Sequence, residues 1–405
     1  MLIKHTILSI HHRMNNSAIK KKHKLIRITT VPISLKTLLK GQLKFMSSTY
    51  EVIGISSSGN ELNEVRSNEE VEVIVVEMTR KISPFKDLKS LYKLYTIFRK
   101  EKPYIVHSHT PKAGIVSMLA AKFAGVPHRL HTVAGLPLME ATGNKRKLLN
   151  FVEKLTYQCA TNVYPNSKGL YDFILENKFV KKAKLKVLGN GSSNGINTNH
   201  FDTNLISSEQ KQQLTETLKI KPTDFVFIFV GRLVADKGIN ELVKAFIKIN
   251  KKNDNAKLIL VGLFEEELDP LASSTLEAIE NIPNIISVGF QQDVRIYFAI
   301  SDCLVFPSYR EGFPNVVMQA GAMGLSSIVS DINGCNEIIE EGINGEIVPV
   351  KDCDALYNSM ERMINNPDWN TSLRKKSREM IVSRYDQAVI WNAILDEYKI
   401  LENYV

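Results

Sequence analysis

The chain has 405 residues, of which 44% are hydrophobic and 23% are charged, and its formal net charge is +9. This composition is typical of a globular protein with a sizeable core, and the length indicates two or three domains. No apolar run approaches the ~18 residues of a membrane-spanning helix, and the start lacks the small-residue cleavage site of a secretory signal.

The positive charge is concentrated in the front half. Residues 1–200 hold 32 Lys and Arg against 13 Asp and Glu, whereas residues 201–405 hold 20 against 30. Such an asymmetry suggests an anionic partner: membrane head groups, a lipid diphosphate or nucleic acid. A merely solvated basic surface is the alternative. Because the chain has no nucleic-acid-binding motif and no interleaving of basic and aromatic residues, we expect no nucleic-acid partner.

Short β-branched runs alternate with helical patterns along the whole chain, which indicates parallel sheets covered by helices on both faces. We therefore predict an α/β fold of two Rossmann-like domains. The expected strands of the first domain span residues 25–31, 50–56, 71–76, 104–109, 128–133 and 185–189. Those of the second span residues 224–231, 256–262, 285–290, 302–307, 326–331 and 345–349.

The segment GNGSSNGINTNHFD, residues 189–202, is rich in Gly, Asn and Ser, as expected of a hinge between domains. We place the first domain at 24–194 and the second at 195–384. The last helical pattern, within 385–405, is expected to return to the first domain. Residues 1–23 are interpreted as a disordered basic extension or an artefact of an upstream start codon, with Met14 as the alternative start.

Histidines follow two expected strands of the first domain. The segment YIVHSHTPKAG carries His107 and His109, and HRLHTVAGLP carries His131 and Thr132. Their spacing is wrong for a zinc site without further ligands. His107 fits a core turn as well as a site, whereas His109, His131 and Thr132 are expected to line a cleft, because ligands of such sheets lie beyond the carboxyl ends of the strands.

A glycine and two cations follow the first strand of the second domain. In FIFVGRLVADKGINELVKAF, Gly231 ends the strand, and Arg232 and Lys237 precede a helix that begins near Gly238. Two cations at this place could neutralise a diphosphate without a metal ion. A solvated basic pair is the alternative interpretation.

The segment REGFPNVVMQAG joins a later strand to a helix, and Pro314 fits the first helical position. The N–H groups of Asn315 and Val316 would then be free at the positive end of the helix, a place that suits a diphosphate. Gln319 can both donate to and accept from a ribose diol. Glu311 can accept from sugar hydroxyls. An ordinary loop-to-helix entry is the alternative.

The four cysteines show neither a C-x-x-C spacing nor neighbouring histidines at metal-ligand spacing, so we expect reduced, mostly buried thiols. They are Cys159, Cys303, Cys335 and Cys353.

The motifs GRL-x3-KG, REGFPNVV-x-x-AGAMG and SDINGCNEIIEEGINGEIVP together resemble the retaining glycosyltransferases of family 4. The resemblance covers nearly the whole chain from about Lys24. HSHTPKAG, HTVAGLP, PNSKGL and GNGSSNGI are similar to bacterial members that build surface polysaccharides and glycans on polyprenyl-diphosphate carriers. The resemblance to family 4 implies the GT-B fold, in which two Rossmann-like domains face each other across a cleft.

The resemblance also implies roles for individual residues. Arg232 and Lys237 match the basic pair that holds the donor diphosphate, and Glu311 matches the first acid of a paired-glutamate motif that contacts the donor sugar. His131 matches a histidine that touches this sugar. The other donor-binding residues implied are Gly231, Phe290, Gly312, Phe313, Asn315, Val316 and Gln319, with Phe290 at the nucleobase pocket.

The chain departs from the family pattern in two places. Gln319 stands where the family usually has a second Glu, and we expect activity to survive with weaker nucleotide binding. The loop after the first strand often has a glycine pair, but PISLKTLLKGQLKF offers only Gly41, which we place at the acceptor side of the cleft.

The expected reaction is transfer of a hexose or N-acetylhexosamine from a UDP-sugar to a polyprenyl-diphosphate-linked sugar, with retention and without metal or other cofactor. The protein would then be cytoplasmic and peripheral on the inner face of the bacterial membrane, held through its basic half. The alternatives are a UDP-sugar 2-epimerase of the same fold and a non-catalytic nucleotide-sugar-binding subunit.

Overall fold

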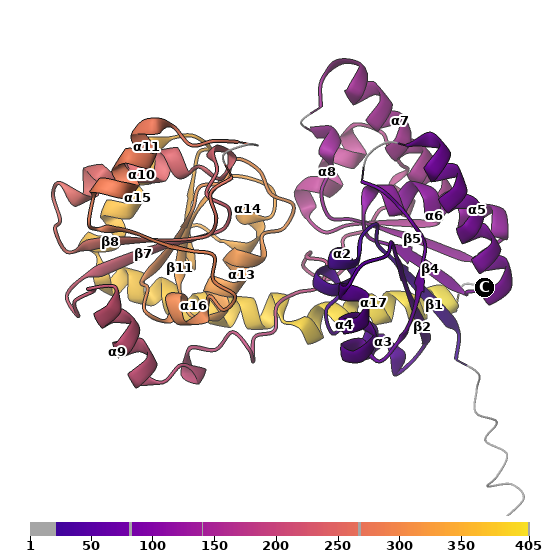
Figure 1. Ribbon diagram of the computed structural model, residues 1–405, viewed down its shortest axis with the longest axis horizontal. Coiled ribbons are helices and arrows are strands. Elements are labelled where there is room, and N and C mark those ends of the chain that lie inside the picture. Colours follow the sequence, from indigo (N-terminus) through magenta and orange to yellow (C-terminus); the bar gives the residue numbers. More distant parts are fainter. Residues whose placement is uncertain (1–21, 81–82, 140, 266–268, 404–405) are drawn as a thin grey trace, which may run out of the picture. The chain divides into compact units, whose positions relative to one another are not determined.

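The computed structural model describes residues 22–80, 83–139, 141–265 and 269–403. The expected N-terminal extension, residues 1–23, therefore lies outside the described residues up to position 21. The chain divides into two compact units, with the boundary between Leu130 and His131. Within the described residues it forms two six-stranded sheets, and Figure 1 shows helices on both faces of each.

The first sheet has the strand order β3-β2-β1-β4-β5-β6, and β1 pairs in parallel with both β2 and β4. Most residues of its strands are buried because helices cover both faces of the sheet. They are β1 (Lys24–Ile28), β2 (Glu51–Ser56), β3 (Glu72–Val75), β4 (Ile105–Ser108), β5 (His128–Val133) and β6 (Asn162–Pro165). The helices among them are α2 (Pro32–Leu38), α3 (Gln42–Ser47), α4 (Glu61–Glu69), α5 (Pro84–Glu101), α6 (Pro111–Ala124), α7 (Gly143–Cys159) and α8 (Lys168–Glu176).

The second sheet has the order β12-β11-β10-β7-β8-β9, and β7 pairs in parallel with both β8 and β10. Its strands are β7 (Phe225–Val230), β8 (Ala256–Val261), β9 (Ile285–Gly289), β10 (Cys303–Phe306), β11 (Ser326–Ser330) and β12 (Gly345–Val348). The helices are α9 (Ser208–Thr217), α10 (Ile239–Asn250), α11 (Ser273–Asn281), α12 (Arg295–Ala299), α13 (Asn315–Ala322), α14 (Cys335–Ile338), α15 (Cys353–Asn365), α16 (Pro367–Tyr385) and α17 (Gln387–Glu402).

The ends of the helices follow from local chemistry. Pro111 opens α6 at a position where its missing N–H would have no intrahelical partner. Gly125 ends α6 with φ +76°, a left-handed conformation that glycine adopts without strain. The α10 helix begins directly after Gly238, as the sequence predicts.

The predicted α/β fold with parallel sheets is confirmed, and most expected strands are present within a residue or two. The expected strand over residues 185–189 is wrong. Leu185 makes only an isolated bridge to Val163, and the chain then turns at Gly189 and Gly191, both with positive φ. The strand β6 was not predicted, because its four residues end in a proline and give little periodic signal.

The C-terminal helix α17 packs through a buried carboxylate. Glu397 accepts a hydrogen bond from the hydroxyl of Tyr164 on β6 at 3.0 Å and forms an ion pair with Lys186 at 2.5 Å. Burial and this carboxylate raise the pKa of Tyr164, so its proton stays in the hydrogen bond. All four cysteines are free, and only Cys353 is not fully buried.

Candidate functional site

The strand order of the second sheet marks where a ligand would bind. The chain leaves β7 toward β8 and β9 on one side, and β10 continues toward β11 and β12 on the other. In open parallel sheets, ligands bind beyond the carboxyl ends of the strands at such a reversal. The two loops that meet there follow β7 and β10, and both carry residues predicted from the sequence to bind the donor.

The loop after β7 brings one lysine to this edge of the sheet. Gly231 follows the strand with φ +154°, and a short 3-10 turn (Ala235–Lys237) places Lys237 directly before α10. Gly238 adopts φ +70°, and a Cβ there would lie 2.1 Å from the carbonyl oxygen of Pro307. This close approach of the two loops requires glycine.

The central feature of the site is an ion pair between these loops. The Nζ of Lys237 lies 2.5 Å from Oε1 of Glu311, and both side chains are more than four-fifths buried, with 15% and 18% exposure. Ser308 donates from its hydroxyl to the same carboxylate oxygen at 3.1 Å. Cys335 is close enough for Glu311 to contribute to the raised pKa of its thiol, after burial, which is the larger cause. The lysine and glutamate predicted by the sequence are thus brought together.

A second set of contacts holds the loop after β10 in place. Arg310 forms an ion pair with Asp236 at 2.7 Å, and the backbone N–H of Tyr309 donates to the Asp236 carbonyl oxygen. The Tyr309 hydroxyl donates to Glu241 on α10 at 2.7 Å. These contacts tie the chain just before Glu311 to the segment that carries Lys237, so they hold the two partners of the ion pair close together.

The helix entrance after Glu311 differs slightly from the prediction. Pro314 is the N-cap residue with ψ +112°, and Asn315 is the first residue of α13. The expectation that Pro314 occupies the first helical position is therefore wrong, because its ψ is extended. Among the described residues, the N–H groups of Asn315 and Val316 have no hydrogen-bond acceptor. Gln319 lies half-buried on α13, and no side-chain hydrogen bond is found for it within the same residues.

Two residues that were not predicted, Asn333 and Gly334, contact the loop before α13. The Asn333 side chain donates to the backbone carbonyl oxygens of Glu311 at 3.2 Å and Gly312 at 2.5 Å. Gly334 has φ +77°, and a Cβ there would lie 2.7 Å from the Gly312 oxygen. Both residues follow β11 within the motif SDINGCNE, so the rule about carboxyl ends of strands could have found them.

Two other predicted donor residues lie apart from the ion pair. Arg232 is half-exposed and pairs with Glu265 at 2.7 Å rather than with Glu311. Phe290 follows β9, which β8 separates from β7, and the residue is 67% exposed. Gly312 and Phe313 lie in the loop before α13, next to Glu311.

On the first sheet, a buried arginine contacts one predicted cleft residue, His109, and the sequence neighbour of another, Gly41. Arg27 of β1 donates from Nε to Nε2 of His109 at 2.9 Å, and also donates to the Gln42 side chain. Gln42 directly follows Gly41, whose N–H donates to the Glu69 carboxylate at 2.5 Å. His107 is fully buried with its ring centroid 4.3 Å from that of His109. Arg27 was missed because the segment LIRIT is typical of an ordinary buried strand.

His131 and Thr132 lie on β5, and both are buried. The ring centroid of His131 is 6.0 Å from that of Tyr157 on α7. One turn earlier on α7, burial raises the pKa of Glu153 to about 7, against a smaller lowering by a hydrogen bond with Tyr157. The pKa of this buried carboxyl therefore lies close to neutral pH.

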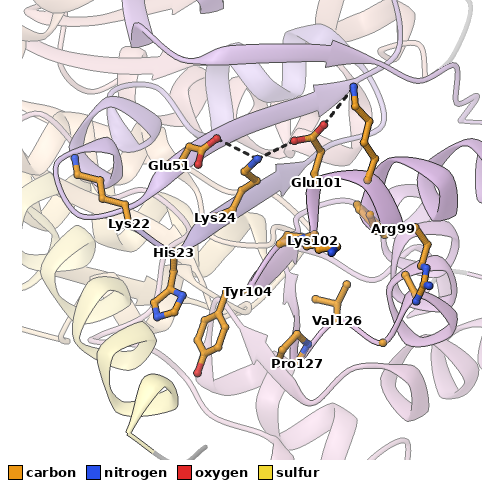
Figure 2. Close-up of a pocket in the computed structure, with 15 residues that line it drawn as sticks. Lys22, His23, Lys24, Glu51, Arg99, Glu101, Lys102, Tyr104, Val126 and Pro127 are labelled. Carbon is orange, nitrogen blue, oxygen red and sulfur yellow. Dashed lines mark hydrogen bonds and ion pairs between the residues drawn. The ribbon is translucent and has the colours of Figure 1, made fainter. Parts of the chain in front are cut away.

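Figure 2 shows a hollow of about 910 Å³ at the amino ends of β1 and β4, the sheet edge opposite the carboxyl ends of these strands. Lys24 lines this hollow and forms ion pairs with Glu51 at 3.1 Å and with Glu101 at 2.8 Å. Within the described residues, no group of three His, Cys, Asp or Glu side chains could hold a metal ion. A helix with the length and apolarity needed to cross a membrane is also not found among them.

Two sequence families match the chain in succession. Residues 49–191 match the family described as glycosyl transferase 4-like domain, and residues 210–380 match glycosyl transferases group 1. The second match contains the loops after β7 and β10, with the ion pair between Lys237 and Glu311.

Three similar proteins extend these matches over the chain. The capsular polysaccharide biosynthesis glycosyltransferase CapM of Staphylococcus aureus is 34% identical over 93% of this chain and 97% of its own length. The Escherichia coli UDP-Gal:α-D-GlcNAc-diphosphoundecaprenol α-1,3-galactosyltransferase is 27% identical over 94% and 98%. The crystal structure of HepE from Anabaena in complex with UDP has a TM-score of 0.78 at 17% identity, covering 93% of this chain and 99% of that one.

Proposed function

The chain belongs to glycosyltransferase family 4 and has its GT-B fold, and from this premise we propose that it transfers a sugar from a UDP-sugar to a polyprenyl-diphosphate-linked sugar with retention of configuration. The observation that carries the proposal is the buried ion pair between Lys237 and Glu311 at the strand-order reversal of the second sheet. A cation and a carboxylate at this place suit the two ends of a sugar nucleotide, its diphosphate and its sugar hydroxyls.

The donor is assigned to the second sheet. Lys237 and Arg232 neutralise the diphosphate, the N–H groups of Asn315 and Val316 bind its oxygens, and Gln319 binds the ribose. Glu311 accepts from the sugar hydroxyls, with Gly231, Gly312 and Phe313 shaping the backbone around them. Phe290 lies against the uracil. The complex of HepE with UDP supports a uridine nucleotide, and the two cations make a metal ion unnecessary in this scheme.

The chemistry is a displacement at the anomeric carbon of the donor sugar. The bond from this carbon to the β-phosphate oxygen breaks, a bond to the acceptor hydroxyl oxygen forms on the same face, and the hydroxyl proton passes to the departing phosphate. Lys237 and Arg232 stabilise the negative charge that develops on the phosphate. Glu311 is held by Lys237 and Ser308, which disfavours it as a covalent nucleophile. His131, with Thr132, His109 and Gly41, is assigned to the side of the acceptor and donor sugar.

The acceptor class rests on the relatives. CapM is described as a capsular polysaccharide biosynthesis enzyme, and the Escherichia coli enzyme extends a sugar on diphosphoundecaprenol. A lipid-linked acceptor places the reaction at a membrane, and the excess of Lys and Arg in residues 1–200 suits the anionic inner face of the bacterial membrane. We assign the protein to that surface, in the synthesis of a surface polysaccharide or glycan.

The test is a transfer assay with UDP-Glc, UDP-Gal, UDP-GlcNAc and UDP-GalNAc, each with a lipid-diphosphate-linked monosaccharide, with EDTA and with Mg²⁺. We expect one UDP-sugar to yield a disaccharide whose new linkage has the donor's anomeric configuration by NMR, at similar rates under both conditions. Inverted configuration would refute retention. An epimerised sugar nucleotide formed without acceptor would indicate the 2-epimerase, and UDP binding without transfer to any acceptor would indicate a binding subunit.

A further inference from the structure

The outer face of α5 carries three large apolar side chains in contact with solvent. Phe85 is 92% exposed, Leu88 is 65% and Tyr92 is 68%. Their spacing of three and four residues places them on one face of the helix. The opposite face buries Ser90, Leu94 and Phe98 in the first unit. Single exposed apolar residues are common, but three on one helix face form a patch that marks an interaction site.

Lysines flank this apolar face on one side. Lys86, Lys89 and Lys93 follow it at helical spacing, and together with Glu77 and Ser90 they line a hollow of about 410 Å³ beside the end of β3. Lys93 donates to the carbonyl oxygen of Val75 at 2.8 Å. Within the described residues, Lys86 and Lys89 form no ion pair, so their charges remain available to an external anion.

The acidic residues of α5 do not offset this charge at the exposed face. Asp87 forms an ion pair with Lys112 of α6 at 2.5 Å, and Glu101 forms one with Lys24 at 2.8 Å. The hydrogen bond to Lys24, a residue of β1, is the main cause that lowers the pKa of Glu101, and Figure 2 draws this pair. Exposed cations continue at the C-terminal end of the helix, where Arg99 and Lys102 line the hollow of that figure.

We propose that this α5 face, defined by Phe85, Leu88, Tyr92, Lys86 and Lys89, docks on the surface of an anionic lipid bilayer. Aromatic and aliphatic side chains enter the interface between head groups and acyl chains, while lysines beside them bind lipid phosphates. In this proposal a lipid phosphate binds at the hollow beside β3 between Lys86 and Lys89. Glu77 also lines this hollow, and its carboxylate accepts a hydrogen bond from the N–H of Ser58 at 3.3 Å. A protein partner would be expected to bring acidic side chains to the same place, but the combination of a bare aromatic stripe and unpaired lysines fits a lipid surface better.

This inference deepens the proposed function, because a lipid-linked acceptor must be reached at the membrane. Its test is independent of transfer: flotation of the full chain with phosphatidylcholine vesicles that contain 30% phosphatidylglycerol, and with vesicles of phosphatidylcholine alone. We expect binding to the anionic vesicles that weakens sharply between low and high salt, since the Debye length shrinks with ionic strength.

Two variants of α5 separate the apolar and electrostatic contributions. The change Lys86→Gln with Lys89→Gln should weaken vesicle binding by about fivefold for each lysine removed. The change Phe85→Ser with Tyr92→Ser should weaken it at least tenfold at any salt concentration. All four side chains are exposed, so both variants should fold, and an unchanged melting temperature verifies this.

Matched controls come from exposed residues of the second unit. The control for charge is Lys251→Gln, at the end of α10, combined with Lys375→Gln on α16. The control for apolar surface is Leu205→Ser combined with Ile343→Ser. Both controls should bind vesicles as the wild type does. If the wild type does not bind anionic vesicles, or if the α5 variants bind no worse than the controls, the proposal is wrong and a protein partner becomes the better explanation.

A transfer assay distinguishes failure of this proposal from failure of the proposed function. The α5 variants should keep the wild-type rate on a short-chain, water-soluble acceptor and lose rate only on an acceptor embedded in vesicles. Vesicle binding without transfer to either acceptor would support the docking face and refute the transferase reaction. Equal rates of variants and wild type on both acceptors would refute the docking face alone.

Discussion

The two sheets reverse their strand order in the same way, but they place different chemistry at the reversal. In the second sheet, the loops after β7 and β10 meet through a charged pair, Lys237 and Glu311, that remains partly open to solvent. In the first sheet, the segments after β1 and β4 meet through neutral hydroxyls, Thr30 and Thr110, whose Oγ1 atoms are 2.7 Å apart. One topology thus offers a site for a charged ligand in one case and a closed structural contact in the other.

The difference shows how loop residues decide what a common fold does. Gly238 allows the second-sheet loops to approach closely enough for a lysine to reach a carboxylate. Thr30 instead accepts a hydrogen bond from the N–H of Ala113 at 3.2 Å, so it caps α6 and occupies the helix start that could otherwise bind an anion. The donor nucleotide is therefore expected at the second sheet alone.

The largest effect on the transfer rate should follow from removing either partner of the ion pair between Lys237 and Glu311. Lys237→Met or Glu311→Gln should each reduce transfer by about 100- to 1000-fold, because each removes a preorganised charge from the reacting centre. A steady-state transfer assay measures this. Lys248→Met is the matched control, because Lys248 forms an exposed ion pair with Asp354 at the same 2.5 Å distance. Turnover of both site variants within a few-fold of wild type would show that the site is assigned wrongly.

A second prediction contrasts two glutamates. Glu311 faces a lysine, whereas Glu153 is buried and its pKa is raised to about 7. Between its ordinary pKa and 7 the folded state binds more protons than the unfolded state, so the free energy of unfolding should fall as pH rises through this window. Glu153→Gln should remove this dependence and stabilise the protein above pH 7 by up to about 3 kcal/mol.

Melting temperatures from pH 4.5 to 8 measure this effect. The wild type and Glu153→Gln should have similar stability at the acid end and diverge as the pH rises. The exposed replacement Glu277→Gln on α11 serves as the control and should parallel the wild type throughout. A constant difference between wild type and Glu153→Gln at every pH would contradict a raised pKa.

The two strand-order reversals also show which site residues could be predicted from the sequence alone and which could not. The loops with Lys237 and Glu311 could be predicted because charged residues and glycines directly follow apolar strands. Thr30, Arg27 and Asn333 could not, because their roles depend on which loops the tertiary fold brings together. A run such as LKVLG has strand-like composition, yet the glycines after it turn the chain away, and only the complete fold decides between the two.

Removing the hydroxyl pair of Thr30 and Thr110 in the first sheet should lower stability and leave catalysis unchanged. Thr30→Val removes the hydroxyl that pairs with Thr110 and caps α6, which should cost about 1–2 kcal/mol of unfolding free energy. UDP affinity should stay at the wild-type value. Thermal unfolding and nucleotide titration measure the two effects, with Thr217→Val as the exposed control whose hydroxyl bonds only within α9. A loss of UDP affinity in Thr30→Val would mean that the first reversal also contributes to the donor site.

The smallest effect concerns the amide that stands where relatives of this family usually carry a carboxylate. Gln319→Glu should raise UDP affinity by about threefold to tenfold, because a charged acceptor strengthens the hydrogen bonds from the ribose hydroxyls. Calorimetric titration with UDP measures this, and Gln213→Glu on the exposed face of α9 controls for the added charge. If Gln319→Glu weakened UDP binding instead, the new carboxylate would be repelling the diphosphate. The ribose would then lie elsewhere. The helix α13 would contribute the N–H groups of Asn315 and Val316 to the donor site, but not the Gln319 side chain.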